Sequence, residues 1–537
     1  MSPAARGALP GLFLALFAAV AVLGLNDNWL LPSAGVDGVA YLWAAPALAA
    51  GEAPLVPLAP WDDPDTLSVV SSRGAGMPVA MSWVVRTGRP PHVAALWVLG
   101  GAVAVAVFAV AWVAGGMAGM AGALAAGLIF LVGSTTLDAA TSIRPELLVA
   151  ALVGLQMGLM AYQPRWHVGH GLLGAVAWWV HPVGLGAVAA ALVWPGMVCR
   201  LAERTRVAHG EADPGEEVSG RLRCPGAWAG AAAAFVGPVL LLAAGVRFGG
   251  AALPGSLAGP HLSAVLGTGG GVIRWGGGGV PGGWGSLLGF VVMAVGILAV
   301  VRDARTTPVP PDDVHWTDPA AADRVALFAR PAAGVLALAL LLTAAAVRVE
   351  PGSLAVLWMP VTVPLSVLMG ASAVRLWPGE LGRGRGGAGG TGAGGLAGWR
   401  TPLWVLLGWI VVSGSVSWRS ASAVRETGRG YTEGRWVPSE IMRWVDNRSY
   451  EWERVYATDP GLILLHSGRR AAGLPRTVSG WGAFGAFVRA APGALVFSGP
   501  VPEEAEEVLK GFRKVVEVAE GSVWVPDADG GAPALRP

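Results

Sequence analysis

The chain has 537 residues, of which 13% are charged and 54% hydrophobic, with a formal net charge of +2. Ordinary soluble domains carry roughly 25% charged residues, so this composition argues against a soluble globular protein. The small net charge and the lack of a basic stripe exclude nucleic acid as the expected partner. The two cysteines, Cys199 and Cys224, cannot form a disulfide framework or a zinc site of cysteine spacing.

Apolar runs that are nearly free of charge recur over the first 419 residues. A helix crosses a bilayer core of about 30 Å with roughly 17 to 25 apolar residues. Including a shorter run that ends at His181-Pro182, we predict about eleven transmembrane helices, at 8–25, 92–114, 116–133, 145–162, 168–180, 182–199, 227–246, 285–301, 331–347, 353–373 and 401–419. Leu25-Asn26-Asp27 offers no small-x-small cleavage site, so the first helix is expected to be retained.

The placement of arginine predicts the orientation. With the N-terminus in the cytoplasm, the connections at 200–226, 302–330 and 374–400 lie inside and carry most of the loop arginines. The outside connections at 134–144, 247–284 and 348–352 hold only Arg144, Arg247, Arg274 and Arg348. This is the positive-inside bias of a bacterial-type plasma (inner) membrane protein. Eleven spans from an inside start put the C-terminal part outside the cytoplasm.

Two predicted outside segments are long. The first external loop, 26–91, contains a stretch from Gly38 to Ala50 that favours a short interfacial helix with Tyr41 and Trp43 as anchors. Several tryptophans are predicted to lie near the outer interface, among them Trp29, Trp43, Trp61, Trp83 and Trp179.

The second segment, 420–537, returns to the charge density of soluble proteins. Strands are predicted at 454–457, 494–497, 515–518 and 523–525, and helices at 502–512 and after Asp459. The predicted fold is therefore an all-α polytopic membrane bundle, 1–419, which includes the loop 26–91 and carries a small extracytoplasmic α/β domain at 420–537.

Asp37 is the acidic residue best placed for chemistry on substrates that the membrane delivers. It lies after the predicted outer end of the first helix and directly before the interfacial helix. A carboxylate there can act as a base, but aspartate is also a common N-cap. The residue itself does not separate these two readings.

A family resemblance begins at this residue. Asp37, Tyr41, Ala45, Leu48 and Gly51 form the pattern D-x3-Y-x3-A-x2-L-x2-G. It resembles the first-loop signature of GT-C class polytopic glycosyltransferases. The nearest in character are the protein O-mannosyltransferases of glycosyltransferase family 39 and the aminoarabinose or mannosyl transferases that act on lipid A and lipopolysaccharide.

Shorter motifs extend the resemblance over most of the chain. Arg144-Pro145-Glu146 is similar to the R-P-D or R-P-E of that class, and His181-Pro182 to its K-P, R-P or H-P turn. The segment from Tyr456 to Pro460, followed by His466-Ser467-Gly468-Arg469-Arg470, is similar to its periplasmic tail pattern.

The resemblance implies an inverting transferase that moves a sugar from a polyprenyl-phosphate donor to a hydroxyl of a lipid, glycan or protein acceptor. It assigns the general base to Asp37, because a hydroxyl is a weak nucleophile until its proton is removed. It also suggests Asp138 as a second acidic residue, although this carboxylate could equally be a solvated loop acid.

The phosphate leaving group requires positive charge near the outer surface. Arg144 and Arg348 are predicted at external helix ends and are the first candidates, with snorkelling anchors as the alternative. Tyr41 and Glu146 complete the predicted substrate-binding set, although Glu146 could simply favour a helix N-terminus.

No cofactor follows from the sequence, and dependence on a divalent metal stays open. Asp63-Pro64-Asp65 matches the D-x-D metal motif of another glycosyltransferase class, but no nucleotide-binding strand precedes it. The histidines form no metal constellation, so no metal ligands are predicted.

Two other classes of function compete with a transferase. A secondary transporter would show internal repeats and ionisable residues at mid-membrane depth, and neither is visible. A non-catalytic protein of the cell envelope is the second alternative, for which replacement of Asp37 would have no effect.

Overall fold

The computed structural model describes residues 3–25, 34–64, 68–69, 76–208, 282–306, 321–346, 359–375, 401–427, 431–475 and 478–527. The chain divides into two compact units. The first comprises Met1–Asp27, Ser71–Met77 and Leu96–Ala423, and the second comprises Asn28–Val70, Pro78–Ala95 and Val424–Pro537. The predicted span 227–246 lies outside the described residues.

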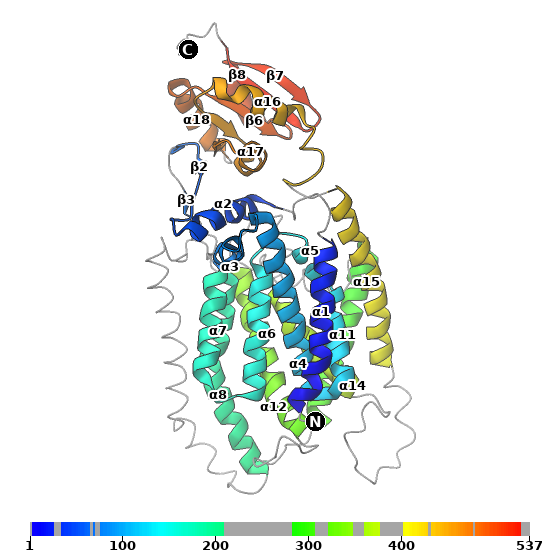
Figure 1. The fold of residues 1–537 in the computed structure, drawn as a ribbon. Coiled ribbons are helices and arrows are strands. Elements are labelled where there is room, and N and C mark those ends of the chain that lie inside the picture. The colour runs from blue at the N-terminus through cyan, green and yellow to red at the C-terminus, as the bar shows by residue number, and fades with distance from the viewer. Residues whose placement is uncertain are drawn as a thin grey trace. The chain divides into compact units, whose positions relative to one another are not determined.

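The first unit is helical (Figure 1). Its helices are α1 (Pro3–Leu25), α4 (Pro91–Val132), α5 (Ser134–Ala140), α6 (Glu146–Tyr162), α7 (His167–Val180), α8 (Leu185–Ala208), α11 (Gly282–Thr306), α12 (Ala321–Ala346), α14 (Met359–Arg375) and α15 (Thr401–Thr427). Gln156 of α6 joins three of them, since its Nε2 donates to His170 O of α7 at 3.1 Å and to Ala187 O of α8 at 2.9 Å.

The segment α4 is two antiparallel helices. As one straight helix its 42 residues would be about 63 Å long, twice the bilayer core. Ala118 and Gly119 leave helical geometry, and Gly119 has a φ of +70° that favours glycine. A Cβ on Gly127 would lie 3.6 Å from the Cβ of Ala111. Residues sixteen apart along one helix cannot approach so closely, so the chain reverses here, where the sequence predicts the break between two spans.

Four helix ends meet at a buried ion-pair network beside this turn. Asp303, 1% exposed at the end of α11, accepts from Arg330 of α12 and from Arg375 Nε of α14, the latter at 3.0 Å. Arg375 also pairs with Asp323 of α12 and donates from Nη1 to Met117 O at 2.7 Å. The network therefore ties α11, α12 and α14 to the reversal in α4.

The opposite end of the unit is held by apolar contacts. Leu25 of α1, Leu137 of α5 and Ala421 of α15 form one buried cluster. Gly76 approaches Val180 so closely that a Cβ on it would lie 2.4 Å from Val180 Cγ2. These positions belong to connections predicted on one side of the membrane, and the ion network belongs to those predicted on the other.

Among the described residues, four helices are long and apolar enough to cross a membrane: Gly7–Leu25, Pro91–Val132, Pro182–Leu201 and Ala322–Ala344. The second of these contains two predicted spans. Glu146–Tyr162 and Met359–Arg375 are shorter apolar helices. The 14 residues of α7 reach only about 21 Å, which is less than a bilayer core.

The second unit contains a six-stranded sheet of order β2-β5-β4-β6-β8-β7. The strands are β2 (Leu58–Pro60), β4 (Val455–Ala457), β5 (Ala471–Gly473), β6 (Ala494–Ser498), β7 (Phe512–Val518) and β8 (Gly521–Pro526). The first four strands of the order pair in parallel, and β8 and β7 are antiparallel additions. A separate two-stranded sheet joins β1 (Leu55–Val56) to β3 (Ser68–Val69).

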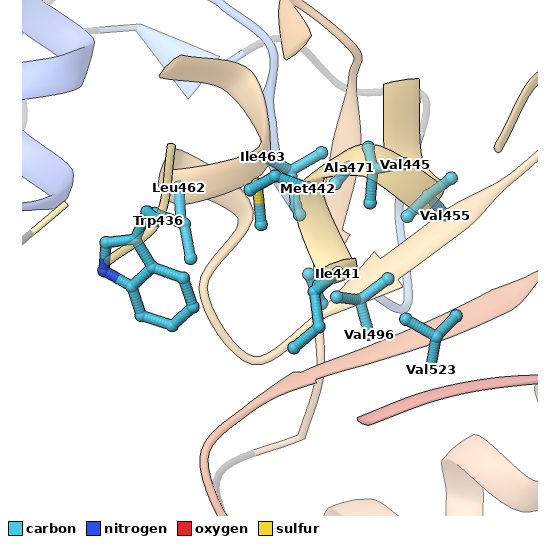
Figure 2. Packing of buried hydrophobic residues seen from close by; sticks show 11 residues of the cluster. Trp436, Ile441, Met442, Val445, Val455, Leu462, Ile463, Ala471, Val496 and Val523 are labelled. Atoms are coloured by element: carbon cyan, nitrogen blue, oxygen red, sulfur yellow. The ribbon is translucent and has the colours of Figure 1, made fainter. Parts of the chain in front are cut away.

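Both faces of the six-stranded sheet are covered. The helices of this unit include α2 (Val36–Ala50), the part of α3 (Gly76–Val85) from Pro78 onward, α16 (Glu440–Arg448), α17 (Pro460–Ser467), α18 (Val478–Ala490) and α19 (Glu506–Leu509). Val455 and Val496 face a core with α16 and α17 (Figure 2), whereas Tyr456 and Leu495 face a second core with α18 and α19. This alternation follows the two-residue period of strands.

The first external loop does not group with the helices as the sequence suggested. Its strand β2 pairs with β5, with Leu58 opposite Ala471. Trp61, assigned from the sequence to the membrane interface, instead packs edge-on against Phe484 and Phe487 of α18 at 5.6 and 5.7 Å between ring centroids. Most of 26–91 therefore belongs to the same compact unit as the C-terminal residues.

Helix positions in the C-terminal part differ from the prediction, which did not include α16 and α18. Instead of a helix over 502–512, Glu503–Ala505 forms a 3-10 turn and α19 ends at Leu509. The strand β7 then begins at Phe512 rather than at 515, because its backbone pairs with β8 from Pro526 onward.

The ion network provides a test of the fold. We expect Asp303→Ala to lower the free energy of unfolding by about 3 to 5 kcal/mol, because it leaves two arginines without their shared buried carboxylate. Thermal unfolding of the full chain in detergent measures the change. Glu507→Ala is the control, since it removes an 82% exposed partner of Lys510 and should alter stability little. Equal stability of the two variants would contradict a stabilising network.

Candidate functional site

Asp37 lies in the first turn of α2. Gly35 is the N-cap, with extended backbone, and no side chain caps this helix. Asp37 is thus the second helical residue and not the cap, which corrects the N-cap reading of the sequence. Its side chain is exposed, and its negative charge is favourable beside the free amides of a helix N-terminus. The carboxylate is therefore exposed at the start of α2.

Both ends of α2 are held within the second unit. Before the helix, Tyr431 N donates to Ala34 O at 3.1 Å. At the other end, Arg86 donates to Leu48 O at 3.2 Å and to Ala49 O at 3.3 Å. A guanidinium is well suited to the unpaired carbonyls of a helix C-terminus. Arg86, which lies in the predicted first external loop, therefore holds the C-terminus of the helix that carries Asp37.

Tyr41 lies one turn after Asp37 and is fully buried. Residues four apart lie one turn apart on a helix, so the buried ring adjoins the turn that carries Asp37. This differs from the interfacial anchor expected from the sequence, a position that Trp43, 43% exposed, fits better. Burial favours packing for Tyr41 over contact with a ligand.

Asp138 lies on the short helix α5 of the first unit and is half-buried. Next to it, the hydroxyls of Thr135 and Thr136 are buried and have no hydrogen-bond partner among the described residues. By contrast, Thr141 Oγ1 donates to Leu137 O and Asp138 O at 3.2 and 3.1 Å. Polar groups that are buried without partners are rare and call for an explanation such as a ligand.

Arg144 and Glu146 enter α6, which packs against α5. Arg144 is half-buried and makes no ion pair with any residue that the structure describes. Glu146 is the first residue of α6 and is 5% exposed, and its Oε2 has no partner within the described ranges. Asp138, Arg144 and Glu146 therefore share one region of the first unit, whereas Asp37 and Tyr41 belong to the second unit.

Thr135 and Thr136 are further candidates that a search for acidic residues does not select. The available signal is the run Ser134-Thr135-Thr136 between two apolar segments. The burial of these threonines depends on how α5 packs. The sequence therefore shows that hydroxyls are present here but not that they lack hydrogen-bond partners.

Two predicted positions lie outside the described residues. Arg348 is one, and Asp65 of the D-x-D motif is the other, whereas Asp63 is exposed. In the ranges that the structure describes, no three His, Cys, Asp or Glu side chains gather as a metal site.

The tail motif is built into the second unit. Thr458 Oγ1 lies 2.8 Å from Ser498 Oγ, and Asp459 is the N-cap residue of α17. Arg469 donates to Trp452 O, and its guanidinium lies 4.8 Å from the ring centroid of Tyr450. Burial lowers the pKa of Arg469 from its ordinary value, and the nearby Tyr450 opposes this shift. These contacts indicate a structural use of the motif.

Comparison with solved structures identifies the fold. Two structures of ArnT from Cupriavidus metallidurans, one bound to undecaprenyl phosphate and one in the apo state, give TM-scores of 0.56 and 0.57. Each is 14% identical and covers 97% of this chain and 99% of its own. The apo oligosaccharyltransferase of Archaeoglobus fulgidus gives 0.51 at 10% identity, covering 90% of this chain and 69% of its own.

No family model and no curated protein matches the sequence. The structural likeness shows that the chain has the GT-C fold of membrane glycosyltransferases, as the loop motif predicted. At these identities the likeness establishes the fold alone. The fold and the long apolar helices are those of a multi-pass membrane protein.

The unpartnered hydroxyl of Thr136 gives a stability prediction. Thr136 is 0% exposed, and an unsatisfied buried polar group costs roughly 1 to 3 kcal/mol. We expect Thr136→Val to keep or raise the thermal stability of the full chain in detergent. Thr141→Val is the matched control and should lower it by about 1 kcal/mol, because it removes a hydroxyl that is hydrogen-bonded. A similar loss in both variants would show that Thr136 has a partner of its own.

Proposed function

We propose that the chain is an inverting membrane glycosyltransferase, which moves a sugar from a polyprenyl-phosphate donor to a hydroxyl of a lipid, glycan or protein acceptor. The observation that carries the proposal is the likeness in fold, over 97% of the chain, to an ArnT that binds undecaprenyl phosphate. The exposed carboxylate of Asp37 at the start of α2 supports it. The acceptor class stays open in this proposal.

Asp37 is the proposed general base. The acceptor oxygen attacks the anomeric carbon while the bond from that carbon to the phosphate oxygen breaks, and the carboxylate receives the acceptor proton. The Asp37 side chain is exposed and therefore accessible to an acceptor, and its negative charge is favourable in the first turn of α2, next to the N-terminus of that helix. A single displacement of this kind inverts the anomeric configuration.

Arg144 is the proposed ligand of the lipid phosphate. Its guanidinium is half-buried without a described carboxylate partner, and guanidinium binds phosphate with two parallel hydrogen bonds. Arg348 keeps the same proposed role from the sequence.

Glu146, Thr135 and Thr136 are proposed to bind sugar or acceptor hydroxyls. An ionised carboxylate only accepts hydrogen bonds, whereas threonine hydroxyls both donate and accept. A polyhydroxylated substrate offers both kinds of partner, which suits the unpartnered atoms of these three side chains. Asp138 is proposed as a second acidic residue of this region. Tyr41 is proposed to support the turn that carries Asp37.

The proposed location is a bacterial-type inner membrane, with the N-terminus in the cytoplasm and the C-terminal residues outside. The arginine-rich connections 200–226, 302–330 and 374–400 support this orientation. Polyprenyl-phosphate sugars are then met on the outer face.

Asp37→Asn should abolish transfer and leave protein abundance unchanged. Cells without the chain are supplied with the wild type, with Asp37→Asn or with Glu440→Gln, and the masses of envelope lipids, glycans and proteins are compared. Glu440 is an exposed first-turn acid of α16, so its replacement is the control for lost helix-dipole stabilisation. Retention of the wild-type sugar by Asp37→Asn would refute the assignment of the base.

Arg144→Gln should weaken the binding of undecaprenyl phosphate by the purified full chain in detergent. Hydrogen bonds to charged groups contribute about 1.5 to 3 kcal/mol, which corresponds to roughly a tenfold to hundredfold loss of affinity. Arg165→Gln removes the same charge from an exposed connection between α6 and α7 and should leave binding unchanged. Equal affinities of the two variants would instead favour a snorkelling role for Arg144.

A further inference from the structure

Tyr431 is hydrogen-bonded through three different groups. Its N–H donates to Ala34 O at 3.1 Å, and its carbonyl lies 2.7 Å from His466 Nε2. Its hydroxyl donates to Asp459 Oδ1 at 2.9 Å. The residue is half-buried, which strengthens these bonds relative to water-exposed ones. Tyr431 is thereby fixed along both its backbone and its side chain.

Two of the three partners of Tyr431 lie at the two ends of one helix. Asp459 is the N-cap residue of α17, and His466 lies in the last turn of that helix. The carboxylate of Asp459 makes no cap bond to its own helix and accepts instead from Tyr431 and from Ser498 Oγ. Ser498 is in turn fixed to Thr458, because Ser498 N donates to Thr458 Oγ1 at 2.9 Å. Tyr431 is thus connected to the central strands of the sheet.

The third partner lies at the start of α2. Ala34 precedes Asp37 by three residues and directly precedes the N-cap Gly35. The first helical bond of α2 runs from Val39 N to Gly35 O at 3.0 Å. The helix α17 itself packs against α2. Tyr431 therefore connects the point where α2 begins with the helix on which α2 rests.

We infer that Tyr431 is a positioning residue for Asp37, held by Asp459 and His466, so that the C-terminal residues set the placement of the proposed base. The inference rests on the proposed function only for the role of Asp37. It gives the tail motif Thr458-Asp459-Pro460 and His466 the role of holding Tyr431 against the start of α2. Transfer is expected to depend on this connection because small displacements of a base slow proton removal.

Tyr431→Phe tests the inference by removing the bond to Asp459 while keeping the ring and both backbone bonds. We expect faster hydrogen–deuterium exchange at the α2 amides from Val39 onward in the full chain in detergent, with the strand amides of β4 and β6 unchanged. The rate of transfer in the cell assay should fall about tenfold. Binding of undecaprenyl phosphate should stay at the wild-type value, because Tyr431 carries none of the proposed phosphate contacts.

The controls separate positioning from general stabilisation. Tyr456→Phe removes a comparable bond, from Tyr456 OH to Ala491 O at 3.1 Å, and should leave α2 exchange unchanged. Asp459→Asn retains an oxygen that accepts from Tyr431 and should preserve most of the protection, whereas Asp459→Leu should behave like Tyr431→Phe.

Unchanged α2 exchange in Tyr431→Phe would overturn the inference, and so would faster exchange with a wild-type transfer rate. If neither the wild type nor Asp37→Asn transfers sugar, the proposed function fails by itself. Exchange in α2 then still decides whether Tyr431 fixes the helix.

Discussion

A charged side chain can be buried in an apolar protein interior only where a side chain of opposite charge pairs with it. One end of the helical unit satisfies this constraint. Asp303 pairs there with Arg330 of α12 and Arg375 of α14, and Arg375 also donates to the carbonyl of Met117. Removing any of the charged members leaves an uncompensated charge, which is why such a network fixes helix ends in register. The reversal in α4 is part of the same junction, so the ends of four helices are determined together.

The first external loop illustrates how distant segments share one fold. Its strand β2 is short and ends at Pro60, a residue suited to sheet edges because it lacks an N–H. β5 supplies the neighbouring strand, and Trp61 adds aromatic contacts to α18. The helix α2, which carries Asp37, packs against α17 of the same unit. The helix that carries the proposed base is thus contacted by residues some four hundred positions later in the chain.

Hydropathy predicted much of the helical unit, because span length and low charge are local properties. The break near residue 115 was predictable for the same reason, and it coincides with the non-helical Ala118 and Gly119. Asp37 and Glu146 were predicted as site residues from their residue type and position, and this assignment stays a prediction. Strand β2 and the packing of Trp61 were not predicted, because the local sequence pattern does not show that β2 pairs with β5 or that Trp61 packs against α18. The partnerless hydroxyls of Thr135 and Thr136 likewise depend on packing that only the folded chain provides.

The buried atoms without partners do not all carry the same weight. Ser366 and Ser372 also lack partners among the described residues, but both lie inside α14, where a hydroxyl can rotate toward the carbonyl of the preceding turn. Glu146 has no such option, because its carboxylate oxygen only accepts and therefore requires a donor from elsewhere. Burying that oxygen costs free energy until a donor arrives. In the proposed function, a substrate rich in hydroxyls would supply such a donor and so relieve the free-energy cost of burying this oxygen of Glu146.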